Sequence, residues 1–282
     1  MSEKKLVAIH DISCTGRCSL TVALPVISAA GIETRVIPTA VLSTHTGGFQ
    51  NYVKQDLTDI IMPTVKHWQS LNLFADVIYS GYLASKEQLD IVSDVFKCLS
   101  HENTLIAIDP VMGDDGVLYD SFDNEFVSQM RKFLKNADVI LPNLTEACLL
   151  LDKPYIDKGY SENEIKDMLK KLCDMGPKMA VITGVEFEKG KIGVATYDAS
   201  LDKYGYFYSP KVDGTFLGTG DIVASAIVSA LTVGLSLERA SQVAVNMAYN
   251  SILHTIQSPY DYRYGVDFEK AIEGFIKDLK SN

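Results

Sequence analysis

The segment TLIAIDP, residues 104–110, is a short apolar run that ends in an Asp-Pro turn. A second apolar run, residues 137–143, comes later in the chain, and a segment of helical period follows it. Five further runs share this character: LVAIH (6–10), RVIPTAVLS (35–43), ADVIYSG (75–81), ADVILPN (137–143) and MAVITG (179–184). Apolar runs of strand length that alternate with helical segments are typical of a parallel sheet. The pattern predicts a doubly wound α/β fold, with helices on both faces of a mostly parallel central sheet.

Two segments depart from this alternation. Pro38 lies inside the run 35–43, and because proline cannot donate to a strand ladder, we expect an edge strand or a bulge there. Residues 191–209 hold two β-rich runs around a polar turn, which predicts an antiparallel hairpin or edge. Helices are expected over six stretches: 20–30, 56–71, 86–99, 162–175 (with a Ser161/Glu164 capping box), 237–254 and 266–279, in addition to the helix discussed below.

The bulk properties limit the classes of function. The chain has 282 residues and a formal net charge of −10, which argues against broad nucleic-acid or anionic-membrane binding. The longest apolar stretch, 222–235, is too short to span a bilayer, and the start of the chain shows no signal-peptide pattern. The five scattered cysteines suggest reduced thiols in a cytoplasmic protein. Without a linker or repeat, we expect one domain over residues 1–282.

Common nucleotide and metal motifs are missing. The segment GTGDIVAS lacks the third glycine of a dinucleotide fingerprint, and GVEFEKGKI (184–192) has the wrong spacing and ending for a Walker A loop. Cys14 and Cys18 have no second pair, and the five histidines are dispersed, so a tetrahedral zinc site is not expected.

Polar residues follow several predicted strands, and ligands of such sheets bind beyond the carboxyl ends of the strands. Asp109 and Asp114 lie in DPVMGDDG, which reads equally well as a turn or as a loop that faces a metal-bound phosphate. Asn143 and Glu146 have the spacing of a helix cap, which by itself is the better interpretation. The same geometry also directs an amide and a carboxylate toward the strand-end crevice, where Mg²⁺ could bind through water.

The most specific segment is FLGTGDIVASAI, residues 216–227. Gly218 and Gly220 permit a tight turn and the close approach of another group. With Thr219, their amides would point toward an anion at the start of a helix. Asp221 in the first turn favours a helix by itself, but it would repel that anion unless it had a chemical role, such as accepting a proton from an attacking hydroxyl.

Taken together, these motifs resemble the pyridoxal/pyridoxamine kinase branch of the ribokinase superfamily over nearly the whole chain. The resemblance is carried by seven segments in order: IHDISCTGRCSLTVALPVISAAGIE (9–33), STHTGGF (43–49), SGYL (80–83), DPVMGDDGVLY (109–119), ADVILPNLTEA (137–147), VITG (181–184) and FLGTGD (216–221). It implies a single-domain ribokinase-like fold, usually homodimeric, and ATP-dependent phosphorylation of the hydroxymethyl group of a B6 vitamer with Mg²⁺ and a monovalent cation such as K⁺.

The resemblance also assigns roles to individual residues. Asp221 would be the general base, and the amides of Gly218, Thr219 and Gly220 would form the anion hole. The ATP phosphates and the metal would be served by six residues: Asp109, Asp114, Asn143, Glu146, Thr183 and Gly184, with Asp109 and Glu146 at the metal. The vitamer would contact four residues: Asp11, Thr46, Tyr82 and Tyr119, the last on a flap formed by residues 111–119.

Two positions depart from the family pattern. Better-known members have serine at the positions of Asp11 and, often, Gly184, which bears on ring recognition and on a phosphate contact. Two rival functions stay open: a hydroxymethylpyrimidine kinase of a sister branch, and a non-catalytic protein that binds pyridoxal phosphate or a nucleotide. The preferred vitamer is left undetermined.

Overall fold

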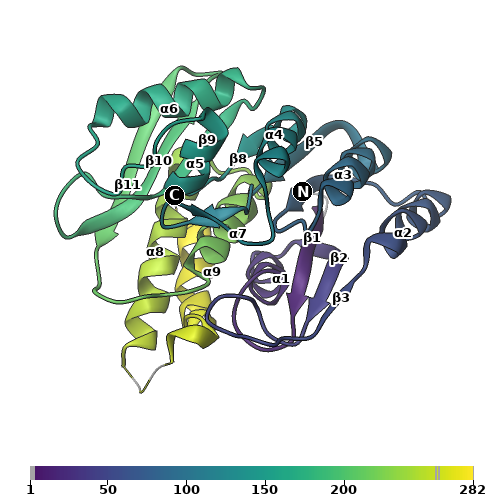
Figure 1. Cartoon of the computed structure of the whole chain (residues 1–282), viewed down its shortest axis with the longest axis horizontal. Helices are drawn as coiled ribbons and strands as arrows, with labels where there is room; N and C mark the ends of the chain where they lie inside the picture. The colour runs from purple at the N-terminus through teal and green to yellow at the C-terminus, as the bar shows by residue number, and fades with distance from the viewer. Residues whose placement is uncertain (1–3, 258, 260, 282) are drawn as a thin grey trace.

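A computed structural model describes residues 4–257, 259 and 261–281 (Figure 1). Within them, nine strands form one sheet in the order β11-β10-β9-β8-β5-β4-β1-β2-β3, and β6 and β7 form a separate hairpin. The strands are β1 (Lys5–Ser13), β2 (Glu33–Leu42), β3 (Lys54–Asp56), β4 (Ala75–Ser80), β5 (Ser100–Ile108), β6 (Gly113–Asp114), β7 (Val117–Leu118), β8 (Val139–Ile140), β9 (Met179–Val185), β10 (Lys191–Asp198) and β11 (Lys203–Pro210). The six strands from β9 to β2 in this order pair in parallel, as expected for a doubly wound sheet.

Helices cover both faces of the sheet. They are α1 (Leu20–Ala29), α2 (Thr58–Ser70), α3 (Lys86–Leu99), α4 (Asn124–Phe133), α5 (Leu144–Leu151), α6 (Glu162–Asp174), α7 (Thr219–Thr232), α8 (Leu237–Thr255) and α9 (Ile272–Lys280). Helices α2 to α6 pack on one face, and α1, α7, α8 and α9 pack on the other (Figure 1). In the described part of the chain, no helix is long and apolar enough to cross a membrane.

The strand sequences divide their side chains between two cores. In β1, Val7 and Ile9 join the core under α2 to α6, whereas Leu6 and Ala8 join the core under α1, α7, α8 and α9. This division follows from the two-residue period of a strand. Because both faces are covered, both sets of residues are apolar, and this is why the strands read as continuous apolar runs.

The edges of the sheet differ in part from the expectation. The hairpin predicted over 191–209 is β10 and β11, which extend β9 in antiparallel fashion. Pro38 does lie at a bulge: His10 pairs with Pro38, but Ile12 pairs with Val41, so β2 has one extra residue. The alternative of an edge strand is wrong, because the short antiparallel strand β3 covers β2. Strand β3 was not predicted from the sequence, because its three residues are all polar and give no apolar pattern.

The helices agree with the predicted ones apart from their ends and one omission. The capping boxes at Asn143 and Ser161 both form. The last predicted helix, 266–279, instead begins as a 3₁₀ turn (Phe268–Ala271) and becomes α9 at Ile272. Helix α4, which Asp123 caps, has no counterpart among the predicted helices.

Candidate active site

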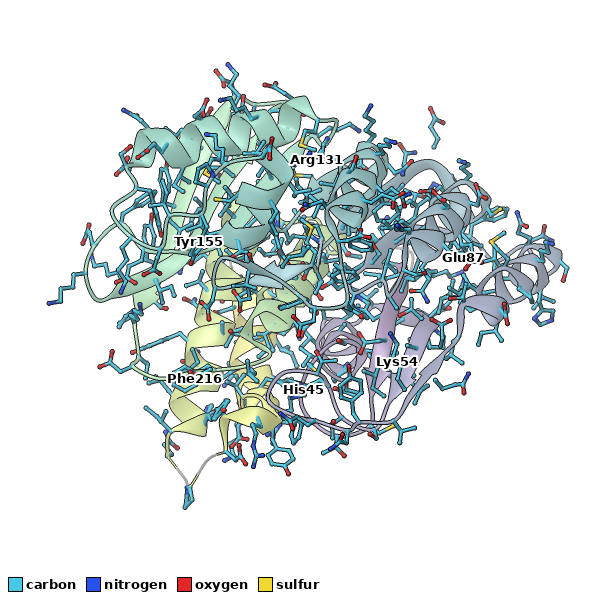
Figure 2. All side chains as sticks on the ribbon, in the orientation of Figure 1. His45, Lys54, Glu87, Arg131, Tyr155 and Phe216 are labelled. Atoms are coloured by element: carbon cyan, nitrogen blue, oxygen red, sulfur yellow. The ribbon has the colours of Figure 1, made fainter. Side chains whose placement is uncertain are left out.

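The loop Gly218-Thr219-Gly220-Asp221 opens α7 without a side-chain cap. Gly218 has φ +81°, and a Cβ atom there would lie 2.1 Å from the carbonyl oxygen of Arg17. Glycine is therefore required both by the backbone conformation and by the close approach of the loop after β1. Thr219 fixes the turn, because its hydroxyl donates to the Phe216 carbonyl at 2.9 Å (Phe216 is labelled in Figure 2). The first amides of α7 have no partners within the helix and are suited to an anion.

A cavity of about 200 Å³ lies beside this loop. We call it the carboxylate cavity, because Asp109, Asp114, Glu146 and Asp221 line it. They come from the end of β5, the β6–β7 hairpin, α5 and α7, so the cavity lies at the carboxyl ends of neighbouring parallel strands, as predicted. No lysine or arginine in the described residues lines it. Four acidic side chains thus share one concave space without a protein cation.

Burial and mutual repulsion disturb these carboxyl groups. Desolvation raises the pKa of Asp221 to about 6, and the charge of Asp11 adds to the rise, while the Ser19 amide opposes it. Desolvation also raises the pKa of Glu146 to about 8, although backbone donors such as the Asn143 and Met112 amides lower it. The pKa of Asp109 is raised by burial and then by the charges of Glu146 and Asp221. All three groups would ionise more readily beside a cation.

The donor set fits Mg²⁺ coordinated partly through water. Carboxylate oxygens are the ligands that Mg²⁺ prefers, and this ion usually keeps several waters beside one or two carboxylates and substrate phosphates. In the described residues, no three His, Cys, Asp or Glu side chains converge closely enough to hold an ion alone. Both oxygens of Glu146 already accept backbone amides, from Met112 at 3.0 Å and Asn143 at 2.8 Å. Asp109, 8% exposed, is thus the freer ligand.

Asn143 ties the site to the hairpin β6–β7. Its carbonyl oxygen accepts the Glu146 amide and its amide group donates to the Gly113 carbonyl, both at 2.8 Å. Asp115 and Gly116 both have positive φ, as a two-residue hairpin requires. The Asp-Gly pair is therefore a turn, as its composition predicts, and the turn also brings Asp114 and Tyr119 to the cavity. The residues of this helix cap, Asn143 and Glu146, therefore also line the carboxylate cavity.

A second cavity of about 250 Å³ adjoins the first and shares Asp114, Asn143, Thr183, Thr219 and Gly220 with it. We call it the apolar cavity, because its further lining is mostly apolar. This lining includes residues that sequence reasoning missed: Ile192, Val194, Val223, Val245, Ala248, Tyr249 and Ile252. The four from α8 recur at helical spacing, 245, 248, 249 and 252, which is a signal that could have shown them as one stripe. From the sequence alone, such an apolar stripe cannot be told from a helix face that packs in the core, because only the positions of the neighbouring strands distinguish the two.

Thr183 and Gly184 lie at the end of β9, beside the apolar cavity. Thr183 bridges to Asn143, which brings two of the predicted site residues together. Gly184 has φ +76°, and a Cβ atom added there would meet nothing within 4 Å. Serine would therefore be strained at this position by the backbone conformation and not by crowding.

The predicted ring-binding residues lie apart from these cavities: Asp11, Thr46 and Tyr82 line neither of them. Asp11 is buried near the end of β1, Thr46 is exposed, and Tyr82 is half-buried just after β4. Asp11 lies close enough to interact electrostatically with both Tyr82 and Asp221, since its charge raises the pKa of each of these groups. Tyr119, which the resemblance also places with the substrate, lines the carboxylate cavity.

Comparisons with known proteins agree with this architecture. A model of the phosphomethylpyrimidine kinase family matches residues 23–263. A Bacteroides thetaiotaomicron protein provisionally named a phosphomethylpyrimidine kinase, crystallised with pyridoxal, is 39% identical with a TM-score of 0.92, over 97% of this chain and 96% of that chain. Pyridoxal kinase from Lactobacillus plantarum is 32% identical with a TM-score of 0.88, over 98% of both chains. Pyridoxal kinase from Ovis aries is 27% identical over 71% of this chain and 68% of its own. The ribokinase-like fold expected from the resemblance is confirmed.

Proposed function

Since the chain belongs to the phosphomethylpyrimidine kinase family, we propose that this kinase transfers the γ-phosphoryl group of ATP to the 5'-hydroxymethyl group of a B6 vitamer: pyridoxal, pyridoxamine or pyridoxine. The observation that carries the proposal is the position of Asp221, at the start of α7 and in one cavity with Asp109 and Glu146. Support for the vitamer comes from the Bacteroides structure with pyridoxal and from the Lactobacillus pyridoxal kinase. One continuous sheet supports a single catalytic domain over the chain. We also propose that the protein forms a homodimer, as the family that its sequence resembles usually does.

The residues suggest a division of labour in the transfer. The hydroxymethyl oxygen of the substrate attacks the γ-phosphorus of ATP, and the Asp221 carboxylate accepts the proton of that hydroxyl. The bond between the γ-phosphorus and the bridging oxygen of the β-phosphate breaks, so ADP leaves. The amides of Gly218, Thr219 and Gly220 donate to the phosphoryl oxygens, on which charge accumulates. The apolar cavity receives the base of the nucleotide, and Thr183, Gly184, Asn143 and Asp114 lie between it and the reacting phosphate.

Asp109 and Glu146 would hold Mg²⁺, with Glu146 acting through water because its oxygens bind backbone amides. When bound there, Mg²⁺ neutralises charge on the ATP phosphates. Burial raises the pKa of both groups, so a cation held beside them would favour their ionised forms. The proposal also includes a monovalent cation such as K⁺, as in the family that the sequence resembles.

An ADP-release assay with Mg·ATP tests the proposal. Pyridoxal, pyridoxamine, pyridoxine and hydroxymethylpyrimidine are compared as substrates under the same conditions. We expect ADP to form with at least one B6 vitamer, and with a higher kcat/KM than for the pyrimidine. The pyrimidine is the second candidate, because the matching family model bears the name of a pyrimidine kinase. Turnover of the pyrimidine alone would support that candidate, whereas ligand-dependent shifts of Tm without ADP would support a binding protein.

The pH dependence of kcat/KM should report the base. Asp221 accepts a proton only when it is ionised, and burial raises its pKa to about 6. We therefore expect log kcat/KM to be flat above pH 7 and to fall with a slope approaching one below about pH 6. Steady-state rates between pH 5 and pH 9 at saturating Mg·ATP measure this. A profile that stays flat down to pH 5, as an aspartate with the ordinary pKa of 3.8 would give, would contradict the predicted shift.

The apolar cavity can be tested by filling it. Ala248→Phe adds a ring on α8 where Ala248 lines the cavity. We expect KM for ATP to rise by roughly tenfold or more, because over-filling a packed site costs about 1–3 kcal/mol, while KM for the vitamer changes little. Steady-state kinetics with each substrate varied separately measure this, and Ala248→Gly is the matched control. Equal increases in both KM values would count against a nucleotide base in this cavity.

A further inference from the structure

We propose that Asp11 and Lys54 together select a substrate ring that carries opposite charges at two positions. Asp11 accepts a hydrogen bond from a protonated ring nitrogen, and Lys54 donates one to a phenolate oxygen on the same ring. This inference rests on the proposed function and defines its substrate class. A 3-hydroxypyridine forms such a zwitterion near neutral pH, whereas hydroxymethylpyrimidine has no phenol group. The pair would thus distinguish the two candidate substrates.

Asp11 supplies the first observation. Its side chain is 4% exposed, and its Oδ1 atom has no hydrogen-bond partner in the described residues. Its Oδ2 atom accepts a 3.5 Å contact from the Ser13 hydroxyl. Burial raises the pKa of Asp11, and hydrogen bonding from the Ser19 side chain lowers it. No ion pair in the described part of the chain involves it. A buried carboxylate with one unpartnered oxygen and no ion-pair partner is unfavourable by itself and is suited to a cationic donor. Serine, which better-known relatives have here, could not neutralise a charged ring nitrogen.

Lys54 supplies the second observation. It lies on the edge strand β3, is exposed, and forms no ion pair among the described residues (labelled in Figure 2). Its ammonium group lies 5.8 Å from the centre of the Tyr82 ring. This cation–π contact holds the Lys54 charge over Tyr82, the tyrosine that the resemblance places at the substrate ring, and it leaves the hydrogen-bond donors of Lys54 available.

The sheet brings the two charges to one place. Ser13 pairs with Leu42, and Leu42 pairs with Lys54, so Lys54 lies two strands across from the end of β1 that carries Asp11. Electrostatics agree with this placement: Lys54 lowers the pKa of Asp11, which burial raises, and Asp11 raises that of Tyr82. The buried anion and the exposed cation are therefore neighbours without being an ion pair. A ring between them would meet both.

The ionisation state of a bound ring gives a test that does not depend on turnover. The zwitterion of pyridoxine absorbs at longer wavelength than its neutral form, so absorbance titrations without ATP report which form is bound. We expect wild-type protein to bind the zwitterion and Lys54→Met to shift the bound ligand toward the neutral form. Lys66→Met, an exposed lysine on α2, is the control and should behave as wild type. The same spectrum for Lys54→Met and wild type would overturn the proposal.

Kinetics separate the two charges. For Lys54→Met we expect KM to rise roughly tenfold for pyridoxine and to stay unchanged for 3-deoxypyridoxine, which lacks the phenol. For Asp11→Asn we expect KM to rise roughly tenfold or more for both. Equal effects of Lys54→Met on the two substrates, or none, would overturn the inference. Wild-type protein that phosphorylates no B6 vitamer would instead refute the proposed function, so the two failures are distinguishable.

Discussion

Asp221→Asn is expected to lower kcat by about 10²–10⁴-fold, the usual effect of removing a positioned base. The amide has nearly the same shape and cannot accept the hydroxyl proton. KM for ATP should change little, because the nucleotide base and phosphates contact other groups. Single-turnover and steady-state rates measure the loss. Asp213→Asn, an exposed residue just before the loop, is the matched control and should retain wild-type kcat.

The same variant should not be less stable. The folded pKa of Asp221 lies above its ordinary value of 3.8, at about 6, so the folded protein binds this proton more tightly than the unfolded chain. The stabilisation by the neutral group is therefore present at low pH and is lost as pH rises through that interval. At pH 8, Asp221→Asn removes a charge from a half-buried position, and the free energy of unfolding of the variant should equal or exceed that of wild type. A folded, stable variant with near wild-type kcat would show that Asp221 is not the base.

Gly218→Ala is expected to damage both the fold around α7 and the reaction. The αL conformation costs a residue with a Cβ atom about 1–2 kcal/mol, and at φ +81° the new Cβ would also lie 2.1 Å from the Arg17 carbonyl. Because that neighbour is backbone, the loop has to move, and the amides of the predicted anion hole move with it. Displacing one such donor lowers kcat by about 10²–10³-fold. Thermal unfolding and steady-state kinetics measure the two effects.

Gly220→Ala is the matched control for stability. Gly220 has no positive φ, and a Cβ there meets nothing within 4 Å. Alanine also favours a helix by about 1 kcal/mol over glycine, so Tm should stay unchanged or rise. If Gly218→Ala unfolded at the same temperature as Gly220→Ala and retained its kcat, the loop would not depend on the contact with Arg17.

The residue patterns that anticipated the structure are local ones. Apolar runs of strand length, the capping boxes at Asn143 and Ser161 and the glycines of the α7 loop each act within a few residues, so they can be read along the chain. Even the bulge beside Pro38 follows from a missing amide. Strand β3 was not predicted, because its three polar residues owe their conformation to pairing with β2. The apolar stripe on α8 was not assigned to a cavity, because residues that line a cavity and residues that face the core recur with the same helical period.

The sequence by itself determined the alternating α/β order, the turn at Gly218 and the presence of carboxylates at strand ends, because propensity, capping and backbone conformation depend on neighbouring residues. Only the tertiary structure decided which of these groups meet. It gathered Asp109, Glu146 and Asp221 around one cavity without a lysine or arginine, and it placed Lys54 above Tyr82 beside the buried Asp11. Charges interact through space rather than along the chain, so the pKa shifts and the unpartnered carboxylate oxygen of Asp11 appear only when β1, β4 and β3 are assembled.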